Sequence, residues 1–92
     1  MAAFEKSTAH KADIIALKKM LSSSNLSATE TIAVQTVLVH KYQQLKEWDI
    51  CLNYCQAQVA LAHQQNNTLA EATFYKLIGG TYYYIPQKEN AI

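Results

Sequence analysis

Half of the 92 residues are apolar, which is enough for one small domain with a single core and too few for two independent domains. The formal charge is only +1 and all eight basic residues are lysines, so the chain lacks the arginine side chains that bind guanine edges and phosphates in pairs of hydrogen bonds. These features argue against a dedicated nucleic-acid-binding protein. Only two glycines and one proline occur, which favours an all-α domain over a β-sandwich or a barrel.

The composition also indicates where the protein resides. Residues 1–21 contain no apolar core of signal-peptide length, and no stretch approaches the roughly 18 apolar residues of a membrane-spanning helix. Cys51 and Cys55 both fall within a predicted helix, a position that fits a reducing compartment better than a disulfide framework. We therefore expect a soluble, cytoplasmic protein with no membrane partner.

The first two helices are predicted from periodicity and a start signal. Ile14, Leu17 and Leu21 recur at helical spacing, which predicts a first amphipathic helix that ends in the polar run of residues 22–25. Ser27 and Glu30 then have the spacing of a capping box, in which each residue bonds the other's backbone amide. This signal predicts a second helix over about residues 28–45.

Two further helices follow. Asp49 is the expected N-cap of a third helix, which ends in the polar run of residues 63–67, where Asn tolerates the left-handed conformation that closes helices. Thr68 and Glu71 repeat the capping-box pattern and open a fourth helix. The fourth helix is expected to end near Ile85, because the residue before Pro86 disfavours helical geometry.

An internal repeat relates the middle of the chain to its end. Aligning residues 36–52 with residues 76–92 pairs Leu38 with Ile78, Tyr42 with Tyr82, Cys51 with Ala91 and Leu52 with Ile92, at an offset of forty residues. The two capping boxes are forty-one residues apart. A period in this range is typical of stacked helical hairpins, in which each unit buries its apolar face against the next.

The later copy resembles a tetratricopeptide repeat, and five residues carry the resemblance: Tyr75, Ile78, Gly79, Tyr82 and Ala91. The earlier copy keeps Leu38, Tyr42 and Cys51 in register, whereas Gln35 and Val39 depart from the pattern. The resemblance implies a right-handed stack of about four antiparallel helices. The period is longer than the usual roughly 34 residues and is similar to that of bacterial regulators with extended repeats.

This resemblance defines an expected organisation. Residues 1–92 form one helical domain, with an N-terminal helix and loop at 1–26, a first hairpin at 27–67 and the start of a second, truncated hairpin at 68–92. Gly79 and Gly80 predict the close approach of a neighbouring helix, since glycine otherwise costs a helix about 1 kcal/mol. Tyr82 is expected in the core beside them, and Trp48 at the turn between the second and third helices.

No catalytic or metal-binding pattern is recognised. Cys51 and Cys55 share a helix face, but a metal site needs two further ligands and His63 lies about three turns away, so we interpret both as packing thiols. His10 and His40 lie on separate predicted elements with no nucleophile or paired carboxylate at a catalytic spacing. We therefore expect no enzyme activity, no metal and no cofactor.

The remaining hypothesis is a protein–protein interaction module. Three consecutive tyrosines span about 200° of a helix, so at least one of Tyr83 and Tyr84 should face outward, next to Ile85. A groove between the second and fourth helices would bind a polypeptide through five polar side chains, which are Gln35, Lys41, Gln43, Tyr75 and Lys76. The resemblance implies adaptor, chaperone or scaffold work.

Two alternatives stay open. One is a peptide-sensing regulatory module or a fragment of a bacterial helical-repeat regulator, and the other is a small helical bundle that only dimerises. The repeat register further predicts that residues 1–92 are not a self-sufficient monomer. They would belong to a longer repeat protein or form a homo-oligomer through the fourth helix.

Overall fold

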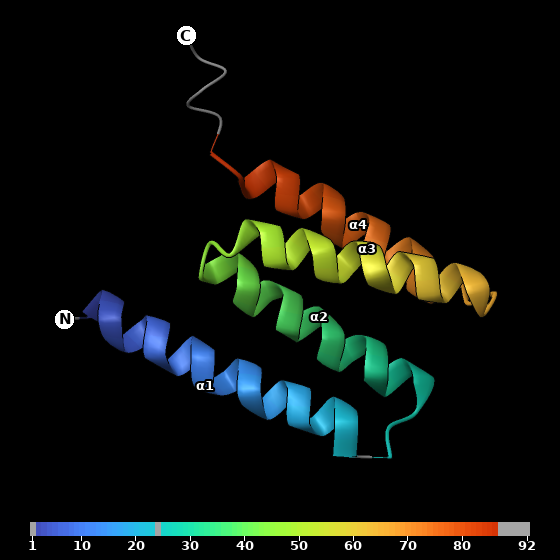
Figure 1. Cartoon of the computed structure of the whole chain (residues 1–92), viewed down its shortest axis with the longest axis horizontal. Helices are drawn as coiled ribbons and strands as arrows, with labels where there is room; N and C mark the ends of the chain where they lie inside the picture. Colours follow the sequence, from blue (N-terminus) through green and yellow to red (C-terminus); the bar gives the residue numbers. More distant parts are fainter. Residues whose placement is uncertain (1, 24, 87–92) are drawn as a thin grey trace, which may run out of the picture. The chain divides into compact units, whose positions relative to one another are not determined.

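The computed structural model describes residues 2–23 and 25–86, which form four α-helices and no strand (Figure 1). The helices are α1 (Ala2–Ser23), α2 (Ala28–Gln44), α3 (Trp48–Gln64) and α4 (Thr68–Tyr84). The predicted all-α class is confirmed. The chain divides into two compact units, Met1–Glu47 and Trp48–Ile92, so the expected hairpin at 27–67 spans the boundary between them.

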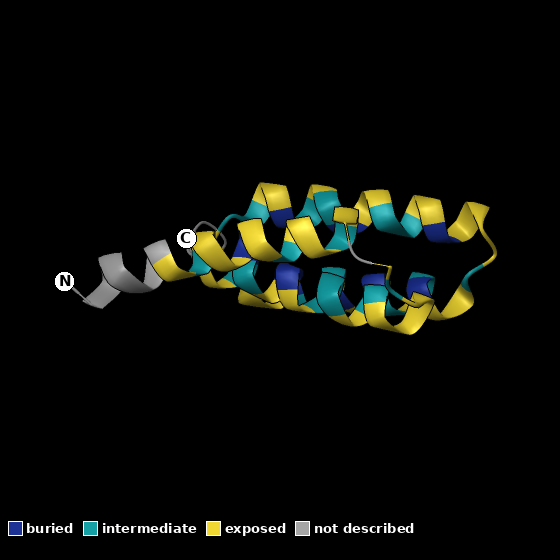
Figure 2. Cartoon of the chain, turned by 90° about the horizontal axis from the view of Figure 1, so that it is seen from below, coloured by how far each residue is buried: buried dark blue, intermediate teal, exposed yellow. Residues whose placement is uncertain are grey.

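Each unit consists of two helices that pack together. In the first unit α1 packs against α2, and in the second α3 packs against α4. Figure 1 shows the two helices of each unit running in opposite directions. Along each helix, buried and exposed positions alternate with helical spacing, so that every helix has an inner and an outer side (Figure 2).

The helices recur at a regular interval. α2, α3 and α4 each contain 17 residues, and they begin at Ala28, Trp48 and Thr68, twenty residues apart. α2 and α4 therefore start forty residues apart, which agrees with the offset between the two aligned segments. Residues 87–92 of the later copy, which include Ala91, lie outside the described residues.

The helix starts correct two of the expected caps. Ser27 forms the complete capping box, with its hydroxyl accepting from the Glu30 amide at 3.1 Å and its own amide donating to the Glu30 carboxylate at 2.9 Å. α4, however, is capped by Asn67, whose side-chain oxygen accepts from the Ala70 amide at 3.1 Å. Thr68 is the first residue of α4 and is not its cap, so the two N-caps are forty residues apart. Asp49 likewise lies in the first turn of α3.

Both α2 and α3 end in a left-handed residue. Lys46 has φ 58° and Asn66 has φ 56°. After α2, the amides of Lys46 and Glu47 donate to the carbonyls of Gln43 and Tyr42, at 3.0 Å each. After α3, the amides of Asn66 and Asn67 donate in the same pattern to His63 and Ala62, at 3.2 and 2.9 Å. The two turns are therefore equivalent Schellman-type helix ends.

The core of the first unit is small. α2 buries Leu38, Val39 and Tyr42, and Ile14 is the buried side chain of α1 among the residues whose side chains are described. Lys18 of α1 lies over the Tyr42 ring, with its amine 5.8 Å from the ring centroid. The predicted inner positions Leu38 and Tyr42 are confirmed as core residues.

The second unit buries small side chains on α3 against larger ones on α4. The buried positions are Cys51, Cys55 and Ala62 on α3, and Ala70, Phe74, Leu77 and Thr81 on α4. Phe74 meets Tyr54 of α3 edge to face, with ring centroids 6.4 Å apart. The small α3 residues let the two backbones approach closely, and Phe74 fills the space between them.

Two predictions about α4 are wrong because the buried stripe lies one residue away from the expected register. The buried residues recur at positions 70, 74, 77 and 81, whereas the repeat pattern indicated 78, 79 and 82 as the inner positions. One residue corresponds to a rotation of about 100° around a helix. Tyr82 is consequently 52% exposed instead of being a core residue, and Ile78 is half-buried.

Gly79 does not mark the close approach of a neighbouring helix. A Cβ atom added at Gly79 or at Gly80 would meet no heavy atom within 4 Å. Gly79 and Tyr82 were both expected to face inward, but both are exposed and lie on the outer side of α4. The prediction of a packing slot at Gly79 is therefore wrong.

Candidate interaction surface

Six exposed residues follow one side of α4 at spacings of three and four, and we call them the α4 outer face: Ala72, Tyr75, Lys76, Gly79, Tyr82 and Tyr83. Tyr83 is the most exposed large hydrophobic residue among those described, at 85%. The three tyrosines and two small residues give this side of α4 a largely apolar surface that is polar at the phenol hydroxyls.

The tyrosines at the end of α4 all face solvent. Tyr83 and Tyr84 contact each other edge to face, with ring centroids 5.8 Å apart and planes at 81°. Ile85 follows as the half-buried C-cap, and its amide donates to the Thr81 carbonyl at 3.1 Å. The expectation that at least one of Tyr83 and Tyr84 faces outward agrees with these positions, and both rings are exposed.

The α4 outer face carries a single charge. Lys76 is exposed and is the one ionisable residue of the six besides the tyrosines. Glu71, the carboxylate of α4, is half-buried on another side of the helix, where an oxygen lies 3.3 Å from Nδ1 of His63 at the end of α3. The face therefore offers one cation beside aromatic rings, with no carboxylate of its own.

The residues predicted on the second helix lie in the other unit and are less accessible. Gln35 and Gln43 are half-buried, and the Gln43 side-chain oxygen lies 2.9 Å from Nδ1 of His40. Lys41 is also half-buried, and its side chain is engaged by α1. Of the five polar residues expected to bind a partner, the structure thus exposes Tyr75 and Lys76.

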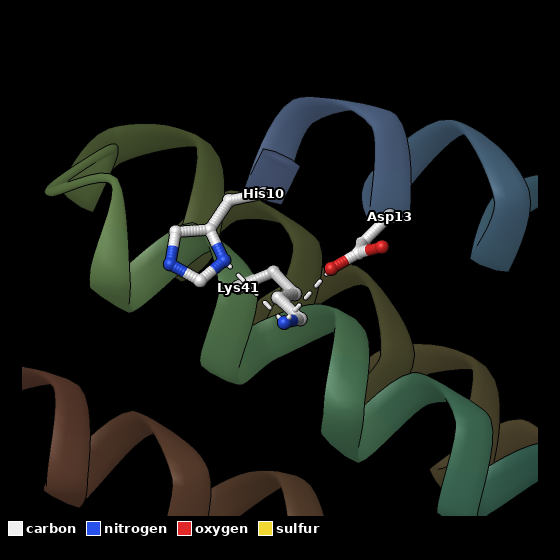
Figure 3. A network of polar contacts seen from close by, with 3 residues as sticks. All are labelled: His10, Asp13 and Lys41. Carbon is white, nitrogen blue, oxygen red and sulfur yellow. Dashed lines mark hydrogen bonds and ion pairs between the residues drawn. The ribbon is translucent and has the colours of Figure 1, made fainter. Parts of the chain in front are cut away.

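Lys41 joins α2 to α1 through two polar contacts (Figure 3). Its amine lies 3.0 Å from a carboxylate oxygen of Asp13 and 3.3 Å from Nδ1 of His10. An ammonium group can only donate, so Nδ1 of His10 is the acceptor in a hydrogen bond with Lys41. Asp13 and His10 had not been assigned any role from the sequence, because nothing in helical spacing indicates which lysine of another helix they meet.

The two cysteines form no disulfide and are both buried on α3, and Cys51 also contacts α4. The Cys51 sulfur lies 3.3 Å from the Thr81 hydroxyl, which itself donates to the Leu77 carbonyl at 2.8 Å. A hydrogen bond with Cys51, together with burial, raises the pKa of the Cys55 thiol far above its ordinary value. Cys55 is therefore held as a thiol in the interior, and the burial of both cysteines agrees with their interpretation as packing groups.

The described side chains form no metal-binding cluster. Within residues 9–23 and 25–86, whose side chains are described, no three His, Cys, Asp or Glu side chains lie close enough together to hold a metal ion. In the same ranges every buried side-chain nitrogen and oxygen has a hydrogen-bond partner. The buried polar side chains of these residues are thus satisfied within the chain.

Comparison of the chain with models of known protein families, with curated proteins and with solved structures finds no match. None of the described helices combines the length and the apolar character that crossing a membrane requires.

Proposed function

We propose that this chain is a non-enzymatic helical module that binds another polypeptide and that the α4 outer face is its contact surface. The observation that carries the proposal is the outward orientation of Tyr75, Tyr82 and Tyr83 on one side of one helix. A module that binds a polypeptide without catalysing a reaction would serve as an adaptor, a chaperone or a scaffold.

The chemistry of the face suits a polypeptide partner. Tyrosine covers a large apolar area with few rotatable bonds and offers a hydroxyl to backbone carbonyls, which is why it is enriched at protein interfaces. Lys76 adds a cation that can pair with a carboxylate or lie over an aromatic ring of the partner. Aromatic side chains beside one cation are also the composition of many binding hot spots.

The regular helices support a further part of the proposal, membership of the tetratricopeptide-like class of helical repeats. α2, α3 and α4 have equal lengths, begin at twenty-residue intervals, and share equivalent turns at Lys46 and Asn66. Such regularity is a property of repeat proteins. Cys51 and Cys55 form no disulfide, which is compatible with a reducing compartment, and the proposal includes a cytoplasmic location.

Affinity capture from a lysate of the native cell tests the binding function. The chain is immobilised as the wild type, as Tyr83→Lys and as Leu61→Lys, which introduces the same charge at an exposed apolar position of α3 outside the face. We expect Tyr83→Lys to lose the polypeptides that the wild type and Leu61→Lys both retain. Far-UV circular dichroism and melting temperatures verify that the variants are folded. Identical capture by all three proteins would contradict the proposal.

A further inference from the structure

The α4 outer face is nearly symmetric about Gly79. Tyrosines lie four residues before and four residues after this glycine, at Tyr75 and Tyr83. Lys76 and Tyr82 lie three residues before and after it. All five residues are exposed, and open space surrounds the position where Gly79 would carry a Cβ atom.

We propose that the polypeptide bound by this face is a second copy of the same chain, with the two α4 helices antiparallel and crossing at Gly79. This inference rests on the proposed function and specifies its partner. A two-fold interface requires that the same patch be complementary to itself after reversal of direction. When the reversal is centred on Gly79, each residue before Gly79 faces the residue at the same distance after Gly79 in the second copy. In this register every one of the five exposed residues around Gly79 lies opposite one of the same five in the second copy.

Each residue then meets a suitable group. Tyr75 lies against Tyr83 of the second copy and Tyr83 against its Tyr75, so that four rings flank the crossing point, where edge-to-face contacts are favourable. Gly79 faces Gly79, and the absence of side chains lets the two helices approach more closely than the usual 8–10 Å between axes. This close approach brings the flanking rings into contact and gives the exposed glycine a role.

Charge selects the antiparallel direction. In the antiparallel register Lys76 faces Tyr82 of the second copy, which allows a cation–π contact on each side of the crossing. The two Lys76 residues are then separated by about 9 Å along the axis, at a rise of about 1.5 Å per residue. In a parallel pairing with the same centre Lys76 would face Lys76, with no carboxylate on the face to neutralise the pair.

The mass of the purified full-length chain tests the association. Sedimentation velocity over a series of concentrations is expected to show conversion from monomer to dimer for the wild type and for Leu61→Lys. Tyr83→Lys and Gly79→Leu are expected to remain monomeric, with half the mass of the dimer. Gly79→Leu is informative because the space around Gly79 accepts a side chain within the chain itself, so the variant should still fold.

Cross-linking tests the register. Under mild oxidation Gly79→Cys alone should form a disulfide-linked dimer, since the two positions coincide at the crossing. Tyr75→Cys and Tyr83→Cys should each fail to link with themselves and should link with each other when the two proteins are mixed. The wild type serves as the control, because its own Cys51 and Cys55 are buried. Self-linking of Tyr75→Cys, or linking of the wild type, would overturn the register.

The outcomes separate this inference from the binding function. A chain that stays monomeric at all concentrations, while Tyr83→Lys still loses its captured polypeptides, would overturn pairing with a second copy and leave the binding surface supported. A monomeric chain whose capture is unaffected by Tyr83→Lys would overturn both. A dimer that persists in Tyr83→Lys and Gly79→Leu would also overturn the inference, because it would form through another surface.

Discussion

The Cys51 sulfur and the Thr81 hydroxyl lie 3.3 Å apart and connect α3 to α4 inside the second unit. The Thr81 hydroxyl donates its proton to the Leu77 carbonyl, so the Cys51 thiol is the donor toward Thr81. Cys55 lies one turn away on the same face of α3 and is also fully buried. The interior of this unit therefore contains two thiols that solvent does not reach.

The first prediction concerns the reactivity of these thiols. Because a hydrogen bond with Cys51 and burial raise the pKa of Cys55, this group stays protonated and unreactive in the folded chain. Labelling with an aromatic disulfide reagent at pH 8 should proceed only as fast as the unit opens, and it should accelerate when urea is added or when Phe74→Leu weakens the core. Rapid labelling of both cysteines in the native protein would contradict the burial described here.

The second prediction concerns the glycine pair of α4. Since an added Cβ meets nothing at Gly80, Gly80→Ala should raise the free energy of unfolding by about 0.5–1 kcal/mol through the higher helix propensity of alanine. Urea denaturation at low protein concentration measures the change. A loss of stability on this substitution would instead indicate that a neighbouring helix packs closely against the glycine pair, as the sequence predicted.

The third prediction concerns the turn after α2. Lys46 adopts φ 58°, a conformation that costs a residue with a Cβ atom about 1 kcal/mol and costs glycine almost nothing. Lys46→Gly should therefore stabilise the first unit by roughly that amount. Asn66→Gly provides the matched comparison at the equivalent turn and should gain less, because asparagine tolerates this conformation better. If Asn66→Gly gained more than Lys46→Gly, the account of the two turns would be wrong.

The fourth prediction gives the pH dependence of the α2 cap. The backbone hydrogen bond from Ser27 lowers the pKa of Glu30 below its ordinary value of 4.5. Because the folded-state pKa is the lower one, the stabilisation is complete above the unfolded-state value and is lost as the pH falls through the folded-state value. Glu30→Gln should thus be less stable than the wild type at pH 7, and the difference should shrink at pH 3 in thermal melts. Ser27→Ala should cost about 1 kcal/mol at pH 7.

Much of the helical architecture is predictable from local signals. Three local signals predicted helix ends of α2 and α4 to within one or two residues. They are the capping box at Ser27, the polar run before α4 and Pro86, which disfavours helical geometry in the residue before it. These signals work because they depend on backbone groups near in sequence. The cap of α4 was misplaced by one residue because Asn67 and Thr68 are both good cap residues, and only the geometry decides between them.

The orientation of α4 was less predictable. α2 and α4 begin forty residues apart, yet Tyr42 is buried and Tyr82 is exposed. The alignment equated the two tyrosines, whereas the side of α4 that is buried with the small α3 residues is the one that carries Phe74 and Thr81. The contact of Lys41 with Asp13 was unpredictable for a similar reason, since it joins two helices whose relative rotation no local pattern specifies.

The central claim is that the α4 outer face binds a polypeptide, and the most direct measurement is the amount captured by Tyr83→Lys relative to Leu61→Lys in one affinity experiment. Both variants add one lysine at an exposed apolar position, so they differ only in whether the face is altered. The account predicts that Leu61→Lys retains the partner bound by the wild type and that Tyr83→Lys loses most of it. Equal retention by the two folded variants would contradict the account.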